Sequence, residues 1–358
     1  MKISAIPARE MDKTLQQRWQ EIQASNPALA NPYFCVEYTE AVAAVRDDVF
    51  VGIMEEDNRV VGFFPFQRKS KKIAGPVGGR LSDYQGVIIS PEQEWSVEDL
   101  MQGCDLNIWD FDHLLAAQQP LESFYEKIAS SPVMNLAEGF ERYVQIKRES
   151  GSKKIKQLQG LWRKFERDIG EFRLELYSEN SAAFQQVIQW KHEQCLRTGV
   201  VDFMSWGWTT GMLEQIWKKR SDNFAGMLSV LYHEDEIIAA HMGMRSATVC
   251  HWWFPGYNHS FSKFSPGGLL LLKVAEEIAG QGIISIDLGK GDDAYKSWFT
   301  TGSIALAEGS VMLPSITTSL RKAQTASDTF LRHSPLALPV RAPLKAAKKL
   351  KRRLMKSG

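Results

Sequence analysis

The sequence predicts a mixed α/β protein of two domains, and three observations support this prediction. The 358 residues are enough for two domains of ordinary size. Helix-like segments alternate with short apolar strands along most of the chain. A polar stretch at residues 147–154, KRESGSKK, separates two such series. We therefore expect domains at residues 1–150 and 151–314, followed by a weakly helical, basic tail at residues 315–358.

The first series combines helices with strand pairs. Residues 12–25 and 34–46 have helical spacing. The apolar runs VFVGIMEED and RVVGFFPFQRK flank an acidic turn, which is typical of a hairpin, and SDYQGVII leads into a further strand. The stretch PVMNLAEGFERYVQIKRE, residues 132–149, is expected to form the last pair of strands in this half.

The second series also combines helices with consecutive strands. Helices are expected at residues 153–168 and 180–197 and in GWTTGMLEQIWKKR, followed by the strands FAGMLSVLYHED, EIIAAHMGMRS and TVCHWWFPGYN. Next come SPGG, an apolar helix, the strand IISIDLG, a short helix and the strand SIALAEGSVML. The hairpins EEDNRVVGFFPF and HEDEIIAAHMGM are alike, which hints at a tandem repeat of one fold.

Composition predicts a soluble cytoplasmic protein. Hydrophobic residues make up 44% and charged residues 24% of the chain, as is usual for globular proteins. No apolar run approaches the roughly 18 residues of a membrane span, and the N-terminus lacks the apolar core of a signal peptide. The four scattered cysteines are expected to be buried, reduced thiols.

The charge is concentrated at the C-terminus. Residues 341–358 carry eight Lys or Arg and no acid, so the rest of the chain has a net charge of −7 against +1 for the whole. A body this acidic is a poor general binder of nucleic acid. Leu344, Ala347, Leu350 and Leu354 share one helical face of the tail, which suits reversible contact with an anionic membrane from the cytoplasmic side. A solvated tail is the alternative.

Three interpretations compete for residues 282–303, GIISIDLGKGDDAYKSWFTTGS. A dinucleotide or methyltransferase site requires this strand to open a βαβ series, but here it comes last and a third glycine is missing. A metal site could draw on Asp287, Asp292 and Asp293, but their spacing lacks the alternating oxygens and closing Glu of a calcium loop. No HExxH motif occurs, so we expect no metal.

The third interpretation begins at Ser265, Pro266, Gly267 and Gly268, which precede the apolar helix. A helix N-terminus offers free backbone N–H groups and a positive dipole end to an anion, and the glycines permit close backbone approach. A thioester could place its pyrophosphate there and its acyl group beside the following strand. Tyr295 would then lie where a departing thiolate needs a proton. For SPGG taken alone, an ordinary helix cap is the alternative.

This order of elements resembles the GNAT acyltransferase superfamily, and more specifically its CelD/FemAB-like branch. The resemblance covers residues of about 150–312 and is most specific from Tyr257 to Trp298, through Y…SPG…LL…A…G…IDLG.GD..YK..W. The N-terminal half is similar more weakly, through LSDYQGVII. The resemblance implies two tandem GNAT-like domains packed side by side.

The resemblance also implies an activity: transfer of an acyl group, most simply acetyl from acetyl-CoA, to an amine of a sugar or a cell-envelope or polysaccharide precursor. Fem-type members use aminoacyl-tRNA instead. This chain lacks the coiled-coil insertion found in several of them, and its body is acidic; both features favour acyl-CoA. A tRNA-dependent aminoacyl transferase remains one alternative. A non-catalytic GNAT-fold component of a polysaccharide assembly system is the other.

Several further residues are candidates for the site. Tyr295, His241 and Asp287 are the catalytic candidates: a proton donor, a base on a strand beside the acyl group, and a carboxylate that orients the acceptor. Core packing of the tyrosine and histidine, and capping of the loop by the aspartate, are the structural alternatives. The substrate-binding candidates are Asp83, Tyr84, Lys296, Trp298 and Arg163.

Overall fold

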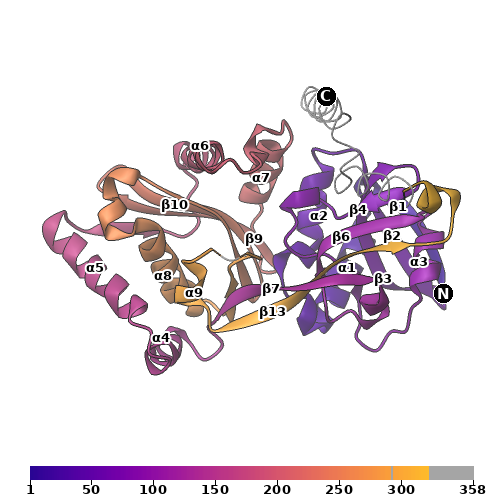
Figure 1. Cartoon of the computed structure of the whole chain (residues 1–358), viewed down its shortest axis with the longest axis horizontal. Coiled ribbons are helices and arrows are strands. Elements are labelled where there is room, and N and C mark those ends of the chain that lie inside the picture. Colours follow the sequence, from indigo (N-terminus) through magenta and orange to yellow (C-terminus); the bar gives the residue numbers. More distant parts are fainter. Residues whose placement is uncertain (292, 322–358) are drawn as a thin grey trace, which may run out of the picture.

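The structure is a computed structural model that describes residues 1–291 and 293–321. Two α/β lobes lie side by side and share one mixed sheet (Figure 1). The strand order is β1-β2-β3-β4-β6-β13-β7-β12-β11-β10-β9-β8, with β5 paired to β3. The expected mixed α/β fold, with two lobes packed side by side, is therefore confirmed.

The first lobe comprises most of the N-terminal half of the chain. Its strands are β1 (Lys2–Pro7), β2 (Val49–Glu56), β3 (Arg59–Ser70), β4 (Ile73–Gly75), β5 (Ile88–Ile89) and β6 (Ile108–Leu115), and its helices are α1 (Lys13–Ser25), α2 (Val36–Ala43) and α3 (Val97–Gly103). Asp12 caps α1 by accepting the Leu15 N–H at 2.8 Å, which fixes where this helix begins. The hairpin expected around the acidic turn is the antiparallel pair β2–β3.

The second lobe contains the remaining helices and five further strands of the described chain. Its helices are α4 (Phe140–Glu149), α5 (Lys154–Asp168), α6 (Ser181–Thr198), α7 (Thr209–Lys218), α8 (Pro266–Ala279) and α9 (Lys296–Phe299), and its strands are β8 (Phe172–Glu175), β9 (Phe224–His233), β10 (Glu236–Ser246), β11 (Val249–Tyr257) and β12 (Ser285–Asp287). Helices α6 and α7 cover one face of this sheet, and α8 covers the other (Figure 1). The sheet therefore separates two apolar cores.

Two long strands connect the lobes. β7 (Tyr125–Asn135) and β13 (Gly302–Met312) are antiparallel partners; β13 also pairs with β6, whereas the end of β7 pairs with β12 (Figure 1). The last described strand of the chain thus completes the sheet beside the first lobe. A boundary at residue 150 remains a prediction, because backbone pairing joins segments from both sides of it.

One sequence expectation is wrong. Residues 132–149 do not form a pair of strands, because only the first part belongs to β7 and the rest forms α4. In α4, Phe140, Tyr143, Val144 and Lys147 are buried at helical spacing, and this packing overrides the β-propensity of the tyrosine and valine. The four cysteines are free and buried, as expected. The basic tail at residues 341–358 and Asp292 lie outside the described residues.

No helix in the described part of the chain combines the length and apolarity that crossing a membrane requires.

Candidate active site

The neighbouring strands β11 and β12 part at the point where both carry a polar side chain. They pair in parallel only through Val249–Ser285, Cys250–Ile286 and His251–Asp287. β12 ends at Asp287, whereas β11 continues to Tyr257 without a partner on that side. The sheet is therefore open beyond His251 and Asp287, and we call this opening the fork.

Asp287 lies fully buried at the fork. It accepts hydrogen bonds from the Tyr84 hydroxyl, from Ser131 Oγ at 2.8 Å and from the Gly289 N–H at 2.8 Å, and its Oδ1 is 3.2 Å from His251 Nδ1. Burial alone would raise the pKa of Asp287, but the hydrogen bonds and the charge of His251 outweigh burial and lower it. Asp287 is thus a fixed, buried carboxylate.

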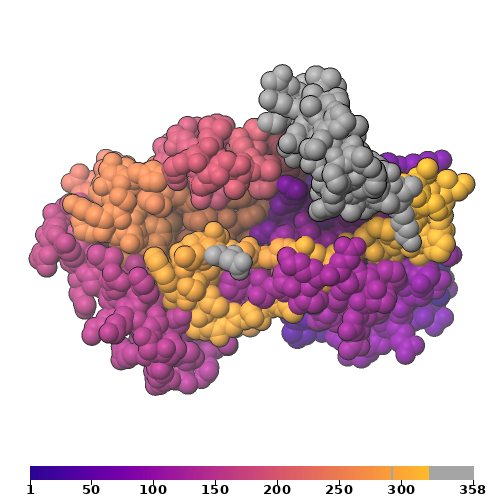
Figure 2. Space-filling view, viewed as in Figure 1, coloured from indigo at the N-terminus to yellow at the C-terminus, as the bar shows by residue number. Residues whose placement is uncertain are grey.

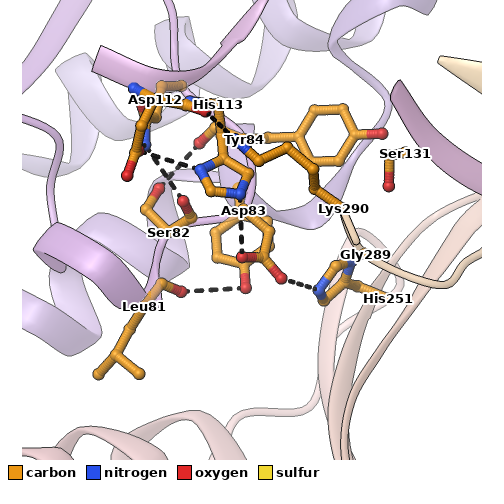
Figure 3. A network of polar contacts seen from close by, with 12 residues as sticks. Leu81, Ser82, Asp83, Tyr84, Asp112, His113, Ser131, His251, Gly289 and Lys290 are labelled. Carbon is orange, nitrogen blue, oxygen red and sulfur yellow. Dashed lines mark hydrogen bonds and ion pairs between the residues drawn. The ribbon is translucent and has the colours of Figure 1, made fainter. Parts of the chain in front are cut away.

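His251 connects Asp287 to a second carboxylate. Its Nε2 lies 3.0 Å from Asp83 Oδ2 (Figure 3). The His251 side chain is completely buried. Burial favours the neutral ring, but the hydrogen bonds and charges of Asp287 and Asp83 outweigh it and raise the pKa of His251 to about 9. A cation therefore lies between two carboxylates at neutral pH. Asp83 is the partner that reaches solvent, with 23% of its side chain exposed.

The loop after β12 passes directly beside Asp83. Gly289 has φ +75°, and a Cβ added there would lie 3.3 Å from Asp83 Oδ2, so this position favours glycine for both conformation and space. Lys296 Nζ donates to the carbonyl oxygens of Gly289 at 3.0 Å and Lys290 at 3.2 Å, and lies 3.2 Å from Asp293 Oδ2. The Lys296 side chain is therefore buried and supports the loop, in contrast to the exposed position usual for lysine.

The four residues of SPGG lie at the N-terminus of α8. Ser265 adopts φ +54° just before Pro266, and the first helical bond of α8 runs from the Leu269 N–H to the Ser265 carbonyl at 3.0 Å. A Cβ at Gly267 would make ordinary contact with the Tyr257 ring at 3.5 Å, whereas one at Gly268 would lie 3.2 Å from Leu158. The N-terminal amides of α8 have no acceptor within the helix, so this end suits an anion.

Tyr295 and Trp298 lie in and beside α9. Tyr295 is half-buried against the apolar core beneath α8, and burial together with the charge of Asp293 raises its pKa, so the phenol keeps its proton at neutral pH. Trp298 is half-buried, and its ring centroid lies 4.6 Å from Lys154 Nζ. Both residues belong to the α8 side of the sheet.

His241 and Arg163 lie apart from this cluster. His241 is fully buried, stacks on Trp252 with ring centroids 3.7 Å apart, and accepts the Trp253 N–H on Nε2 at 3.0 Å. Burial lowers its pKa further, so His241 is a neutral core histidine whose Nε2 is already occupied. Arg163 is exposed and lines a groove of about 270 Å³ with Trp162, Leu269 and Lys273.

The structure thus brings together Asp83, Tyr84, Asp287 and the loop held by Lys296. Three residues that the sequence analysis did not single out complete the network: His251, Ser131 and His113. His251 and His113 occur in the short apolar strands TVCHWWF and NIWDFDHL. A histidine within an apolar strand is the sequence signal that could have indicated them. No three or more His, Cys, Asp or Glu side chains within residues 1–291 and 293–321 are arranged to hold a metal ion.

Comparison with known proteins gives a family match within the second lobe. Residues 152–297 match the profile of the acetyltransferase (GNAT) domain family. The fold resembles that of the crystal structure of FemX, at 9% identity and a TM-score of 0.60 over 89% of this chain and 99% of that one. It also resembles the C-terminal domain of a putative lysylphosphatidylglycerol synthetase from Agrobacterium fabrum, at 12% identity and a TM-score of 0.52 over 87% and 96% of the two chains.

A third similar structure is L-PGS from Bacillus licheniformis, at 11% identity and a TM-score of 0.50 over 87% of this chain and 95% of that one. At these identities the solved structures establish the fold alone. No curated protein sequence matches the chain significantly. Residues 152–297 thus match the acetyltransferase (GNAT) domain family, and the fold of the chain resembles that of FemX.

Proposed function

We propose that this chain transfers an acyl group, most simply acetyl, from a CoA thioester to an amine of a sugar or of a cell-envelope or polysaccharide precursor. One observation supports this proposal above the others. At the fork between β11 and β12, α8 packs against one face of the strands, and Asp83 contacts His251 where the two strands part. The space-filling view shows the surface hollowed between α6 and the segment that follows β12 (Figure 2).

The donor is assigned to the α8 side of the fork. The backbone N–H groups of Gly267 and Gly268, together with the positive end of the α8 dipole, would receive the pyrophosphate. Beyond the immediate helix backbone, one ring atom of Tyr257, at 3.5 Å, is the single contact that the described residues make within 4 Å of a Cβ built at Gly267, so the space beside this backbone is largely open. Tyr295, protonated at neutral pH, is the donor of a proton to the departing thiolate.

The acceptor is assigned to the Asp83 side. Asp83 would accept a proton from the acceptor ammonium, which frees the nitrogen lone pair to attack the thioester carbonyl. The new C–N bond forms as the C–S bond breaks. The thiolate takes its proton from Tyr295, and the second proton of the nitrogen restores the Tyr295 phenol. His251 is held between Asp287 and Asp83 and fixes the orientation of the Asp83 carboxylate.

An aminoacyl donor is the second candidate. FemX and the putative lysylphosphatidylglycerol synthetase share this fold over most of their length, and the second name describes a protein that transfers an amino acid. Such a donor would use the same fork and the same Asp83. The net charge of −7 outside residues 341–358 favours CoA over tRNA, because tRNA binding depends on extensive phosphate contacts.

The test is release of free thiol from acetyl-CoA and longer acyl-CoAs in the presence of a panel of amino sugars and other amines. Asp83→Asn should lower kcat by about 10²–10⁴-fold. Asp202→Asn is the matched control, because Asp202 also pairs with a histidine, His192, at 2.8 Å. A folded wild type that transfers only from aminoacyl-tRNA would favour the second candidate. Full activity of Asp83→Asn would overturn the role of Asp83.

A further inference from the structure

A line of polar groups leads from Asp83 away from the fork. The other oxygen of Asp83, Oδ1, lies 3.8 Å from His113 Nε2, and His113 Nδ1 lies 3.0 Å from Asp112 Oδ1 (Figure 3). Exposure rises outward: His251 is buried, whereas 14% of the His113 side chain and 48% of the Asp112 side chain are exposed. Asp83 therefore lies between one histidine enclosed in the protein and another near its surface.

The outer part of this line is held in place by its neighbours. Gln85 donates from Nε2 to Asp112 Oδ1 at 2.7 Å, and its Oε1 accepts the N–H groups of Asp112 and His113 at 2.9 and 3.1 Å. Lys290 Nζ donates to the Asp112 carbonyl at 2.6 Å. Burial alone would raise the pKa of Asp112, but the hydrogen bonds from His113 and Gln85 outweigh it and lower it. Asp112 is thus an ionised carboxylate held against His113 Nδ1.

The chemistry of the proposed function requires an exit for one proton. An acceptor ammonium loses two protons as it becomes an amide, and the departing thiolate takes up only one. The remaining proton is left on Asp83, which must release it before the next turnover. His251 cannot carry it outward, because both of its ring nitrogens already face carboxylates and its side chain has no exposed surface.

We propose that His113, oriented by Asp112, carries this proton from Asp83 to solvent. The inference rests on the proposed function, since it assigns the proton that acyl transfer to an ammonium leaves behind. His113 receives the proton on Nε2 while Nδ1 remains hydrogen-bonded to Asp112, and the imidazolium then gives a proton to water. A gap of 3.8 Å is longer than a direct hydrogen bond, so the transfer requires a bridging water or a small rotation of the Asp83 carboxylate.

The charged groups around His113 favour this direction of transfer. Asp112 and Asp83 face the ring from its two sides, and both stabilise the imidazolium. Lys290 lies behind Asp112, where its charge is shared with Glu308 at 3.0 Å. The positive His251 lies beyond Asp83 and disfavours return of the proton towards the fork. His113 acts through Asp83 and is therefore a positioning and relay residue, not one that touches substrate.

The test compares kcat of the wild type and His113→Asn at low and high buffer concentration, with the acyl-CoA and amine that the wild type uses. We expect kcat of His113→Asn to fall by about tenfold or more at low buffer, with KM unchanged. Free imidazole should restore much of the lost kcat, because a small base can reach the exposed side of Asp83. His192→Asn removes a histidine from a similar pair with Asp202, and should neither lose activity nor respond to imidazole.

Two results would overturn the relay. The first is wild-type kcat in folded His113→Asn at low buffer, which would leave acyl transfer through Asp83 intact and show another proton route. The second is a loss of kcat that imidazole and buffer cannot restore, which would make His113 merely structural. A wild type without thiol release from any acyl-CoA would instead contradict the proposed CoA-dependent function, and the relay with it.

Discussion

Substitution of Asp287 by asparagine should destabilise the whole molecule, because this carboxylate joins groups from both lobes. It accepts hydrogen bonds from Tyr84 in the first lobe and from Ser131 on the connecting strand β7, and it faces His251 on β11. Asparagine keeps the size of the side chain, so no cavity forms. It removes the negative charge and turns an NH₂ group towards groups that all donate to Asp287 in the native protein.

The magnitude follows from burial. Asp287 and His251 are both fully buried, and removing one partner of a buried ion pair costs about 3–5 kcal/mol. His251 can respond by losing its proton, so we expect the lower end, about 3 kcal/mol. Ser131→Ala removes one hydrogen bond of 2.8 Å to the same carboxylate and should cost about 1–2 kcal/mol.

The assay is urea unfolding at pH 7, followed by tryptophan fluorescence and circular dichroism. A double-mutant cycle with His251→Gln separates the pair from its surroundings, and the two substitutions together should cost clearly less than the sum of each alone. A loss below about 1 kcal/mol for Asp287→Asn, or strict additivity with His251→Gln, would refute the account of this buried pair.

Three other outcomes follow from the site. The pKa of His251 rises from an unfolded value near 6.5 to about 9, so protonated His251 adds on the order of 3 kcal/mol to the free energy of unfolding. This contribution is complete below about pH 6.5 and is lost as pH rises through 9. The free energy of unfolding should therefore be lower at pH 10 than at pH 6, and His251→Gln should remove most of that difference. Tyr295→Phe should lower kcat by about 10²-fold while acyl-CoA affinity is retained, and equal kcat would exclude the phenol as proton donor. The full chain should co-sediment with anionic vesicles at low salt more than a version ending at Val340, and equal pelleting would exclude membrane contact through residues 341–358.

The elements of the donor side could be predicted from the sequence because they are local. SPGG followed by an apolar run predicts the start of α8, and an apolar strand before the glycine-containing loop predicts β12. The same local reasoning failed for residues 132–149, where tyrosine, valine and isoleucine favour strands by composition but occupy helical positions in α4. The helical spacing of Phe140, Tyr143, Val144 and Lys147 indicates the correct structure, whereas the strand-favouring composition indicates the wrong one.

The network at the fork could not be predicted in the same way. His251 and Asp83 are 168 positions apart in the chain, and Tyr84 and Asp287 are 203 apart, so no motif of fixed spacing can encode them. Asp83, Tyr84 and Asp287 were identified as separate candidates, but their histidine partners were not. His241 also lies on a strand of the second lobe, but it stacks on Trp252 and accepts the Trp253 N–H, whereas His251 contacts two carboxylates.

Calorimetric titration of acyl-CoA into the wild type, Gly267→Ala and Gly267→Asp tests the central claim most directly. A methyl group at position 267 makes only ordinary contact with Tyr257, so Gly267→Ala should retain most of the affinity. Gly267→Asp adds a negative charge at the positive end of α8 and should weaken binding by about tenfold or more, with the fold intact. The account predicts one molecule bound per chain and this order of affinities. Absence of binding by any acyl-CoA, or equal affinity of folded Gly267→Asp, would contradict it.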